Sequence, residues 1–267
     1  MERAAAAAWI TVLVCLLAQV ATESAMRTPY SFLRDAISDL GVTTCTPQIC
    51  SPWFWMVDGS FIVLGLCLVL GGWLSHISAP RLWWGSWAAT VGLSVGGLGM
   101  AVVGLVPENV HFSLHVAGAL AGLIGANVGT LFAGWALLRV RGHRVTGGSA
   151  IVVGVVGVAG SALSILVFGR YLPALLNVGG GLERLGVEPL LLITALSGGT
   201  LLLGEDVLAV ALRRVRPSRL PGSDDQRDLA PEAPERAQLD VEPLPVELVN
   251  HLGEQEGQVV HHEGRPY

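Results

Sequence analysis

Leu105-Val-Pro-Glu-Asn-Val-His-Phe-Ser-Leu-His115 is a short polar segment that separates two long apolar runs. The run before it covers residues 82–106, and the run after it covers residues 115–138. About 20 consecutive apolar residues are needed to cross the hydrocarbon core of a bilayer as an α-helix. We therefore interpret the segment as the turn between two membrane helices, which places its polar side chains at one membrane surface.

The composition extends this interpretation to most of the chain. Apolar residues make up 52% of the 267 residues and charged residues only 14%, whereas charged residues make up about 25% of an ordinary soluble domain. The 34 glycines fit closely packed membrane helices. We predict an all-α membrane protein with six transmembrane helices in a domain that covers residues 1–212. The predicted spans are residues 4–21, 53–74, 82–106, 115–138, 149–168 and 187–204.

The first apolar run, residues 4–21, has two interpretations. It is followed by small residues around position 25, so a cleaved signal peptide is one alternative. It is also close to the length that spans a bilayer, and we favour an uncleaved membrane helix.

The positions of the arginines predict the orientation of the helices. On the side of the chain termini lie Arg3, Arg81, Arg139, Arg141, Arg144, Arg213, Arg214, Arg216 and Arg219. Near the spans on the other side lie only Arg27, Arg34, Arg170 and Arg184. Because basic residues collect on the cytoplasmic side, we expect both termini in the cytoplasm of a cell (plasma) membrane protein. A cleaved first run would leave the C-terminus on the same side.

Residues 213–267 differ in character from the rest. From residue 217 onward the chain contains 11 acidic residues and four arginines, a net charge of −7 against −5 for the whole protein. This segment is rich in proline and acids and shows no periodicity, so we predict a disordered acidic cytoplasmic tail with an unknown partner. No basic surface typical of nucleic-acid binding is present, and the expected partner of the chain is the lipid bilayer.

A polar segment, residues 23–52, joins the first two spans. Within it, Tyr30–Gly41 places apolar residues on one helical face between a proline and a glycine. We predict a short amphipathic helix in the first extracytoplasmic loop, lying on or dipping into the membrane surface. Cys45 and Cys50 lie in the same loop, where a local disulfide is expected outside the reducing interior, with free thiols as the alternative.

The predicted orientation brings polar residues of three connections to the outward face. Asp58 lies about one turn inside the second span, and an ionisable group at that depth is costly unless it faces the bundle or a wet cavity. Arg184 is expected to pair with Glu183 or to clamp the loops by holding Asp39 or Glu108, with ligand binding as the alternative. The candidate polar cluster comprises Ser38, Asp39, Asp58, Glu108, His111, His115, Glu183 and Arg184.

These connections also carry motifs in a recognisable order. They are Tyr30-Ser31 with Ile37-Ser38-Asp39-Leu40-Gly41, Gly104-Leu-Val-Pro-Glu108 with His115, and Gly181-Leu-Glu-Arg184. Over about residues 5–210 the chain resembles the domain-of-unknown-function 998 family of multi-pass bacterial membrane proteins. The resemblance implies the six-helix fold and the membrane location, and it brings no settled activity. Asp58 stands where Asn is expected in that family.

We therefore expect an uncharacterised integral membrane protein whose polar cluster orders the loops or binds a small or lipid-like ligand. One alternative is a metal-dependent hydrolase of lipid or acyl substrates. His111 and His115, four residues apart, would then join Asp39 as ligands of a divalent metal such as zinc, with Glu108 as the general base. These residue types resemble those of membrane hydrolases that hold zinc, although the third histidine of that pattern is missing from the outward face.

A second alternative is a proton- or ion-coupled transporter. Asp58 and His115 would form the relay at the outer side. Its inward continuation would depend on Asn127, Ser161 and Thr194, the weak polar candidates within the later spans.

Overall fold

The computed structural model describes residues 2–78, 83–203 and 206–215. Within these residues the regular structure is entirely helical, and six helices are long and apolar enough to cross a membrane. The six candidate spans are Arg3–Ser24, Phe54–Ser78, Trp87–Leu105, Phe112–Leu137, Arg144–Phe168 and Pro173–Leu203. The predicted all-helical fold with six membrane helices is confirmed.

The first span consists of two helices, α1 (Glu2–Thr11) and α2 (Leu13–Ser24). Each later span contains one long helix: α3 (Phe54–Ser78), α4 (Trp83–Leu105), α5 (Phe112–Leu137), α6 (Arg144–Phe168) and α7 (Gly179–Leu203). The short elements are the 3-10 helices η1 (Ser38–Gly41) and η3 (Pro173–Val178) and the helix α8 (Val207–Val215).

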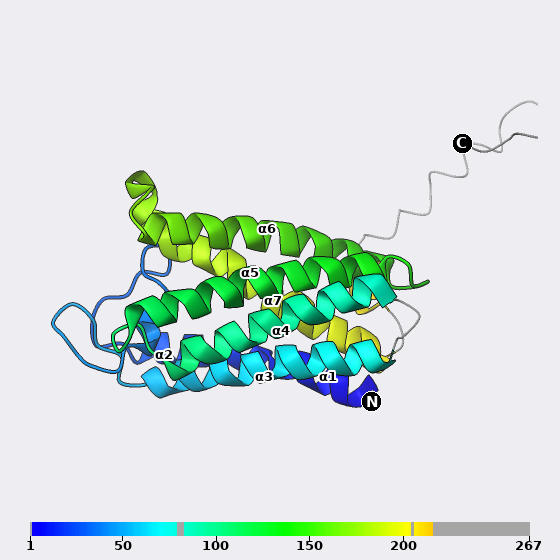
Figure 1. Cartoon of the computed structure of the whole chain (residues 1–267), viewed down its shortest axis with the longest axis horizontal. Coiled ribbons are helices and arrows are strands. Elements are labelled where there is room, and N and C mark those ends of the chain that lie inside the picture. The colour runs from blue at the N-terminus through cyan, green and yellow to red at the C-terminus, as the bar shows by residue number, and fades with distance from the viewer. Residues whose placement is uncertain (1, 79–82, 204–205, 216–267) are drawn as a thin grey trace, which may run out of the picture. The chain divides into compact units, whose positions relative to one another are not determined.

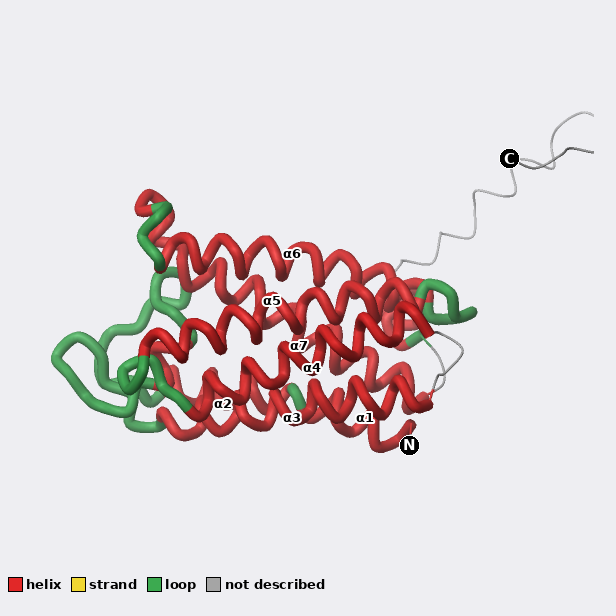
Figure 2. The backbone as a smooth tube through the Cα atoms, in the orientation of Figure 1, coloured by secondary structure: helices red, strands yellow, loops and turns green. Residues whose placement is uncertain are grey.

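The helices pack in a closed ring that follows the chain. From α3 to α7 each long helix contacts the next one, and α1 packs against both α7 and α3 to close the ring. Figure 1 shows these helices running side by side along the bundle. The connections 25–53, 106–111 and 169–178 therefore meet at one end, here called the loop end, and Figure 2 shows them gathered there. The N-terminus and the α5–α6 connection lie at the opposite end, here called the terminal end.

Large apolar side chains cover the outside of the bundle. Leu17 is 70% exposed, Leu98 65% and Val152 61%, and exposed leucines also lie on α3 and α7. A soluble monomer rarely leaves contiguous apolar surface of this kind in water, whereas lipid tails cover it at no cost. The outer surface therefore fits a multi-pass protein embedded in a bilayer.

Glycines allow α4 and α5 to approach closely, as their spacing in the sequence predicts. A Cβ atom at Gly92 would lie 2.7 Å from the Cα of Gly129, and one at Gly96 would meet the backbone of Ala126. Gly97, on another face of α4, lies in the same way against Gly65 of α3. Small residues at such contacts let helix backbones pack without intervening side chains.

The predicted amphipathic helix over residues 30–41 is wrong. Turns occupy most of this segment, and only η1 is helical. An α-helix would pair the amide of Ile37 with the carbonyl of Leu33. In the structure, Ile37 N donates to Glu183 at 2.9 Å, and Leu33 O accepts from Gly181 N at 2.8 Å. Bonds to α7 thus replace the bonds of a local helix.

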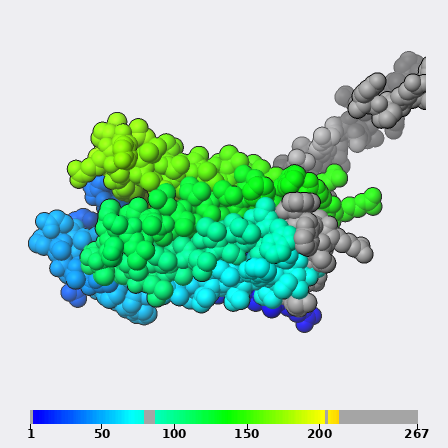
Figure 3. Space-filling view, viewed as in Figure 1, coloured from blue at the N-terminus to red at the C-terminus, as the bar shows by residue number. Residues whose placement is uncertain are grey.

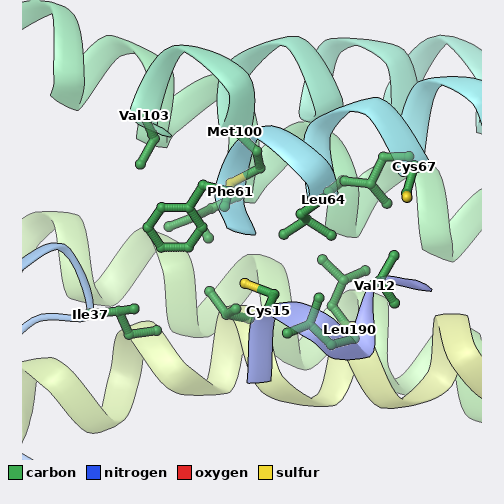
Figure 4. Packing of buried hydrophobic residues seen from close by; sticks show 14 of the residues in the cluster. Val12, Cys15, Ile37, Phe61, Leu64, Cys67, Met100, Val103 and Leu190 are labelled. Atoms are coloured by element: carbon green, nitrogen blue, oxygen red, sulfur yellow. The ribbon is translucent and has the colours of Figure 1, made fainter. Parts of the chain in front are cut away.

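The C-terminal half of the segment is packed into the bundle. Ile37 and Leu40 are both 0% exposed and belong to the main apolar core with Phe61 and Val103. Figure 4 shows Ile37 projecting from the loop into the bundle. The first loop is therefore part of the packed interior of the loop end.

The boundary of the predicted tail needs a small correction. Residues 213–215, assigned to the tail, complete the helix α8. The remainder of the predicted tail, residues 216–267, lies outside the described residues.

The close α4–α5 contact generates a stability prediction. Gly96→Ala should lower the stability by about 1–3 kcal/mol, because the added methyl collides with the backbone of α5. Thermal unfolding of the detergent-purified protein measures this. Gly59→Ala on α3 is the matched control, since nothing lies within 4 Å of the added carbon, and it should be neutral or slightly stabilising. Equal effects of the two substitutions would contradict the packing described here.

Candidate functional site

Arg184 lies at the centre of the polar contacts at the loop end. It is on α7, one turn from the start of the helix, and is only 3% exposed. Its Nη1 donates to the carbonyl oxygens of Phe32 at 2.9 Å and Asp35 at 3.2 Å. Its Nη2 donates to the hydroxyl of Tyr30 at 2.6 Å, and its Nε lies 3.4 Å from Glu188 Oε1. One guanidinium thus holds several points of the first loop.

Tyr30 extends this contact back into the loop. Its hydroxyl accepts from Arg184 and donates to the carbonyl oxygen of Ala36 at 2.8 Å. Burial raises the pKa of Tyr30 above its ordinary value, so the hydroxyl keeps the proton that it donates. The ring of Phe32 covers the guanidinium, with 4.1 Å between the Arg184 carbon and the ring centroid.

The first turn of α7 bonds to the same loop through its backbone. The amides of Gly180 and Gly181 donate to the carbonyl oxygens of Arg34 and Leu33, at 3.3 and 2.8 Å. These amides have no partner within a helix, and the loop satisfies them. A side chain at Gly180 would collide with the backbone of Asp35, so glycine is required for this approach.

Carboxyl groups from two loops meet beside this contact. Ser38 Oγ donates to Glu108 Oε2 at 2.8 Å, which links the first loop to the α4–α5 turn. The side chain of Asp39 is hydrogen-bonded to Glu108 and also accepts from the amide of Ala36 at 2.9 Å. Burial, followed by repulsion from the Glu108 charge and the hydrogen bond to it, raises the pKa of Asp39 to about 7. Asp39 therefore holds a proton at a pH where an exposed aspartate is ionised.

Glu183 brings a third carboxyl group from α7. It accepts the amide of Ile37, and its charge acts on Asp39, while the charge of Glu108 acts on both Asp39 and Glu183. Asp39, Glu108 and Glu183, here called the acid cluster, come from three different connections or helices. The hydrogen bonds of these residues, of Ser38 and of Arg184 join the first loop to the α4–α5 turn and to α7.

The remaining predicted members occupy other positions. Asp58 is 9% exposed on α3 and lies under Gly41, where a side chain would collide with its carboxylate. His115 is 6% exposed, and its Nδ1 donates to the carbonyl oxygen of Val106 at 2.8 Å. His111 is exposed at the start of α5, where its Nδ1 accepts the amide of Leu114 at 3.3 Å.

Each histidine side chain is therefore hydrogen-bonded to a backbone group of α5 or of the turn before it. Within the described part of the chain, no group of three or more His, Cys, Asp or Glu side chains is arranged to hold a metal ion. The structure does not bring His111, His115 and Asp39 together as the ligand set that zinc requires.

Other contacts fasten the rim of the loop end. Cys45 and Cys50 are joined by a disulfide. Asn109, in the α4–α5 turn, accepts the amide of Thr43 at 3.2 Å and donates to the hydroxyl of Thr44 at 3.1 Å. Figure 3 shows the first loop, in light blue, and the segment after α6, in yellow-green, at the surface of this end.

Two important residues were missed by the sequence predictions. The sequence analysis named Tyr30 only as part of a family motif. Nothing in the sequence indicates that its hydroxyl is hydrogen-bonded to Arg184. Asp206 at the terminal end accepts the amides of Val145, Thr146 and Ala209 at 3.0–3.1 Å, so it caps both α6 and α8. An aspartate directly before a helix is a usable signal for a helix cap, so the capping of α8 by Asp206 was predictable. The capping of α6 by the same residue was not, because sequence spacing does not show which helices lie side by side.

The raised pKa of Asp39 generates a pH prediction. The folded protein binds this proton more tightly than the unfolded chain, whose pKa is near 3.8. Its contribution to stability is therefore fully present below pH 3.8 and is lost as the pH rises through about 7. Between pH 4 and 8 the stability should fall by up to about 4 kcal/mol, and Asp39→Asn should flatten this slope. Chemical unfolding across this pH range measures it.

Asp35→Asn is the control, because Asp35 titrates in the opposite sense. A hydrogen bond from Arg34 lowers the pKa of Asp35 below 3.8, so its stabilising effect is lost only in more acidic solution. The control should keep the wild-type slope between pH 4 and 8. A slope in Asp39→Asn as steep as in the wild type would contradict the assignment.

Comparison with known proteins supports the resemblance of the sequence motifs. No match is found among curated proteins or among solved structures. A family model described as "Protein of unknown function (DUF998)" matches residues 6–200, which cover most of the first and last membrane spans, the whole of the other four and the acid cluster. The chain therefore belongs to the DUF998 family of proteins of unknown function.

Proposed function

We propose that the polar cluster is a loop-ordering device in a cell-membrane protein, and that it holds residues 30–41 across the extracytoplasmic end of the bundle. The observation that carries this proposal is the buried guanidinium of Arg184. Its donors are directed at backbone carbonyls of the loop and at Tyr30, rather than at an open space where a substrate would bind.

The energetic argument concerns the cost of burying a charge. A guanidinium taken out of water is strongly destabilising unless hydrogen bonds replace its hydration. Here the first loop supplies three of these bonds and Gly180 O of α7 supplies a fourth at 3.3 Å, while the Glu188 carboxylate lies at ion-pair distance, 3.4 Å from Nε. Loss of the loop contact would remove three of the four hydrogen bonds of Arg184. The loop and α7 are therefore stable only together.

The extracytoplasmic placement rests on the distribution of arginines. Arg139, Arg141 and Arg144 lie around the α5–α6 connection at the terminal end, and basic residues mark the cytoplasmic side. The Cys45–Cys50 disulfide at the loop end agrees with this orientation, because disulfides persist outside the reducing cytoplasm.

The geometry gives little support to the hydrolase alternative. Glu108 lies within general-base distance of the Ser38 hydroxyl. However, His111 and His115 contact backbone groups at different points of α5 and its preceding turn, so they do not complete a metal centre or orient this pair.

One observation keeps a transporter as the second candidate. The Oδ1 of Asn127 and the hydroxyl of Ser161 are buried in the middle of the bundle without a hydrogen-bond partner, and both side chains are 0% exposed. Polar atoms of this kind inside a membrane bundle mark paths for ions or protons in other proteins. Proton flux into liposomes containing the protein, lost in Asn127→Leu, is the result that would favour this candidate.

The loop-ordering proposal predicts how the loop responds when Arg184 is removed. In Arg184→Ala, chymotrypsin should cut after Phe32 or Leu33 at least tenfold faster than in the wild type, because the segment opens more often. Arg27→Ala is the matched control: it removes an exposed arginine at the same end and should leave the cleavage rate unchanged.

The same assay separates orientation from loop ordering. Cleavage of Arg184→Ala should occur in right-side-out spheroplasts and not in sealed inside-out vesicles. Cleavage from the inside-out side would reject the orientation alone, whereas equal rates in Arg184→Ala and Arg27→Ala would reject the loop-ordering role.

A further inference from the structure

A cavity of about 260 Å³ lies inside the bundle at the terminal end, away from the acid cluster. All six membrane spans contribute to its lining, from α1 through α7. This volume is slightly below the range of about 300–1,000 Å³ that small-molecule sites in proteins usually enclose, so the space fits only a ligand at the small end of that range. A water molecule or a group of similar size occupies about 30 Å³, which leaves room for about eight or nine such groups.

Most of the cavity wall is apolar. Ala5 of α1, Leu93 of α4, Ala136 of α5 and Ile193 of α7 line it, together with other small residues. Small side chains leave the space open, because a larger residue at any of these positions would fill it. An occupant must therefore be largely hydrocarbon.

Two polar atoms on the wall lack a partner. The hydroxyl of Thr200 is buried without a hydrogen bond, and this side chain is only 2% exposed. The Nδ1 of His143, in the connection before α6, is also buried and unpartnered. Leaving a buried polar group unsatisfied is destabilising, so each atom indicates a missing partner. Both residues lie toward the terminal end of the cavity.

The surroundings of this polar part are basic. Arg141 and Arg144 flank His143 in the sequence and are exposed at the same end. The neighbouring acid, Asp206, is already occupied by the amides and the hydroxyl that it accepts from α6 and α8. A negatively charged head group would therefore be attracted to this end, where the described acid beside the cavity, Asp206, already has hydrogen-bond donors.

We propose that the cavity binds a single-chain carboxylate of about eight carbons, drawn from the cytoplasmic side of the membrane. The hydrocarbon chain occupies the apolar space between the helices. The carboxylate accepts hydrogen bonds from Thr200 and His143 and lies in the positive field of Arg141 and Arg144. This role is independent of the loop-ordering proposal, because it concerns the opposite end of the bundle.

Binding of radiolabelled octanoate to the full-length protein in phosphatidylcholine nanodiscs tests the proposal, with empty nanodiscs as the blank. The expected result is saturable binding of about one octanoate per chain. Octanol, which lacks the charge, should compete at least tenfold more weakly, and octyltrimethylammonium should not compete. Absence of saturable binding above the blank, or competition by the cation equal to that of octanoate, would overturn the proposal.

Two variants locate the site. Ala136→Phe fills the cavity and should weaken octanoate binding at least tenfold, whereas Ala117→Phe, on the outer surface of the same helix, should leave it unchanged. Thr200→Val keeps the shape of the side chain and removes one hydrogen bond to the carboxylate, for which we expect about tenfold weaker binding. Thr200→Val decides the outcome if Ala136→Phe does not fold. Wild-type affinity in Thr200→Val, or in a folded Ala136→Phe protein, would reject the cavity as the site.

Discussion

The buried guanidinium of Arg184 is the constraint on which the loop end depends. A charge that is only 3% exposed has to be surrounded by acceptors, and the first loop supplies them through the hydroxyl of Tyr30 and the carbonyl oxygens of Phe32 and Asp35. The loop backbone therefore does not form the hydrogen bonds of a local helix. Instead, loop carbonyl oxygens accept from the amides at the start of α7, and a loop amide donates to the carboxylate of Glu183.

This exchange explains why the loop is buried although it is polar. Once its backbone bonds to α7, Ile37 and Leu40 reach the apolar core between α3, α4 and α7. The acid cluster then closes the arrangement from the side of the α4–α5 turn, with Ser38 and Asp39 bonded to Glu108. Protonation of Asp39 reduces the repulsion between these carboxyl groups, so the contact is stronger when Asp39 is protonated.

The membrane domain was predictable because its signals are local. Long apolar runs define the spans, and the glycines of α4 and α5 indicate their close contact. The arrangement of the loop was not predictable for the opposite reason. The apolar spacing of residues 30–41 favours a helix, but the competing acceptors and donors come from α7, about 150 residues later.

The sequence predicted which residues belong to the candidate site, but it did not predict all of their partners. The sequence placed Ser38, Asp39, Glu108, Glu183 and Arg184 on one face, and the structure brings them together. It did not identify the partners of Arg184, because backbone carbonyls carry no sequence signal, and for the same reason it did not identify the backbone contacts of His111 and His115. The cavity at the terminal end was not predicted, since its lining residues are scattered over all six spans.

The central claim is that the first loop and α7 form one cooperative unit at the loop end of the bundle. Hydrogen exchange of the wild-type protein in nanodiscs tests this most directly, through the amides of Ile37 and Gly181, which donate across the contact. If the two segments are stable only together, both amides exchange slowly and at similar rates, close to those of amides within α3. Exchange of the Ile37 amide as fast as that of the loop tip, residues 44–48, while Gly181 stays protected, would contradict the account.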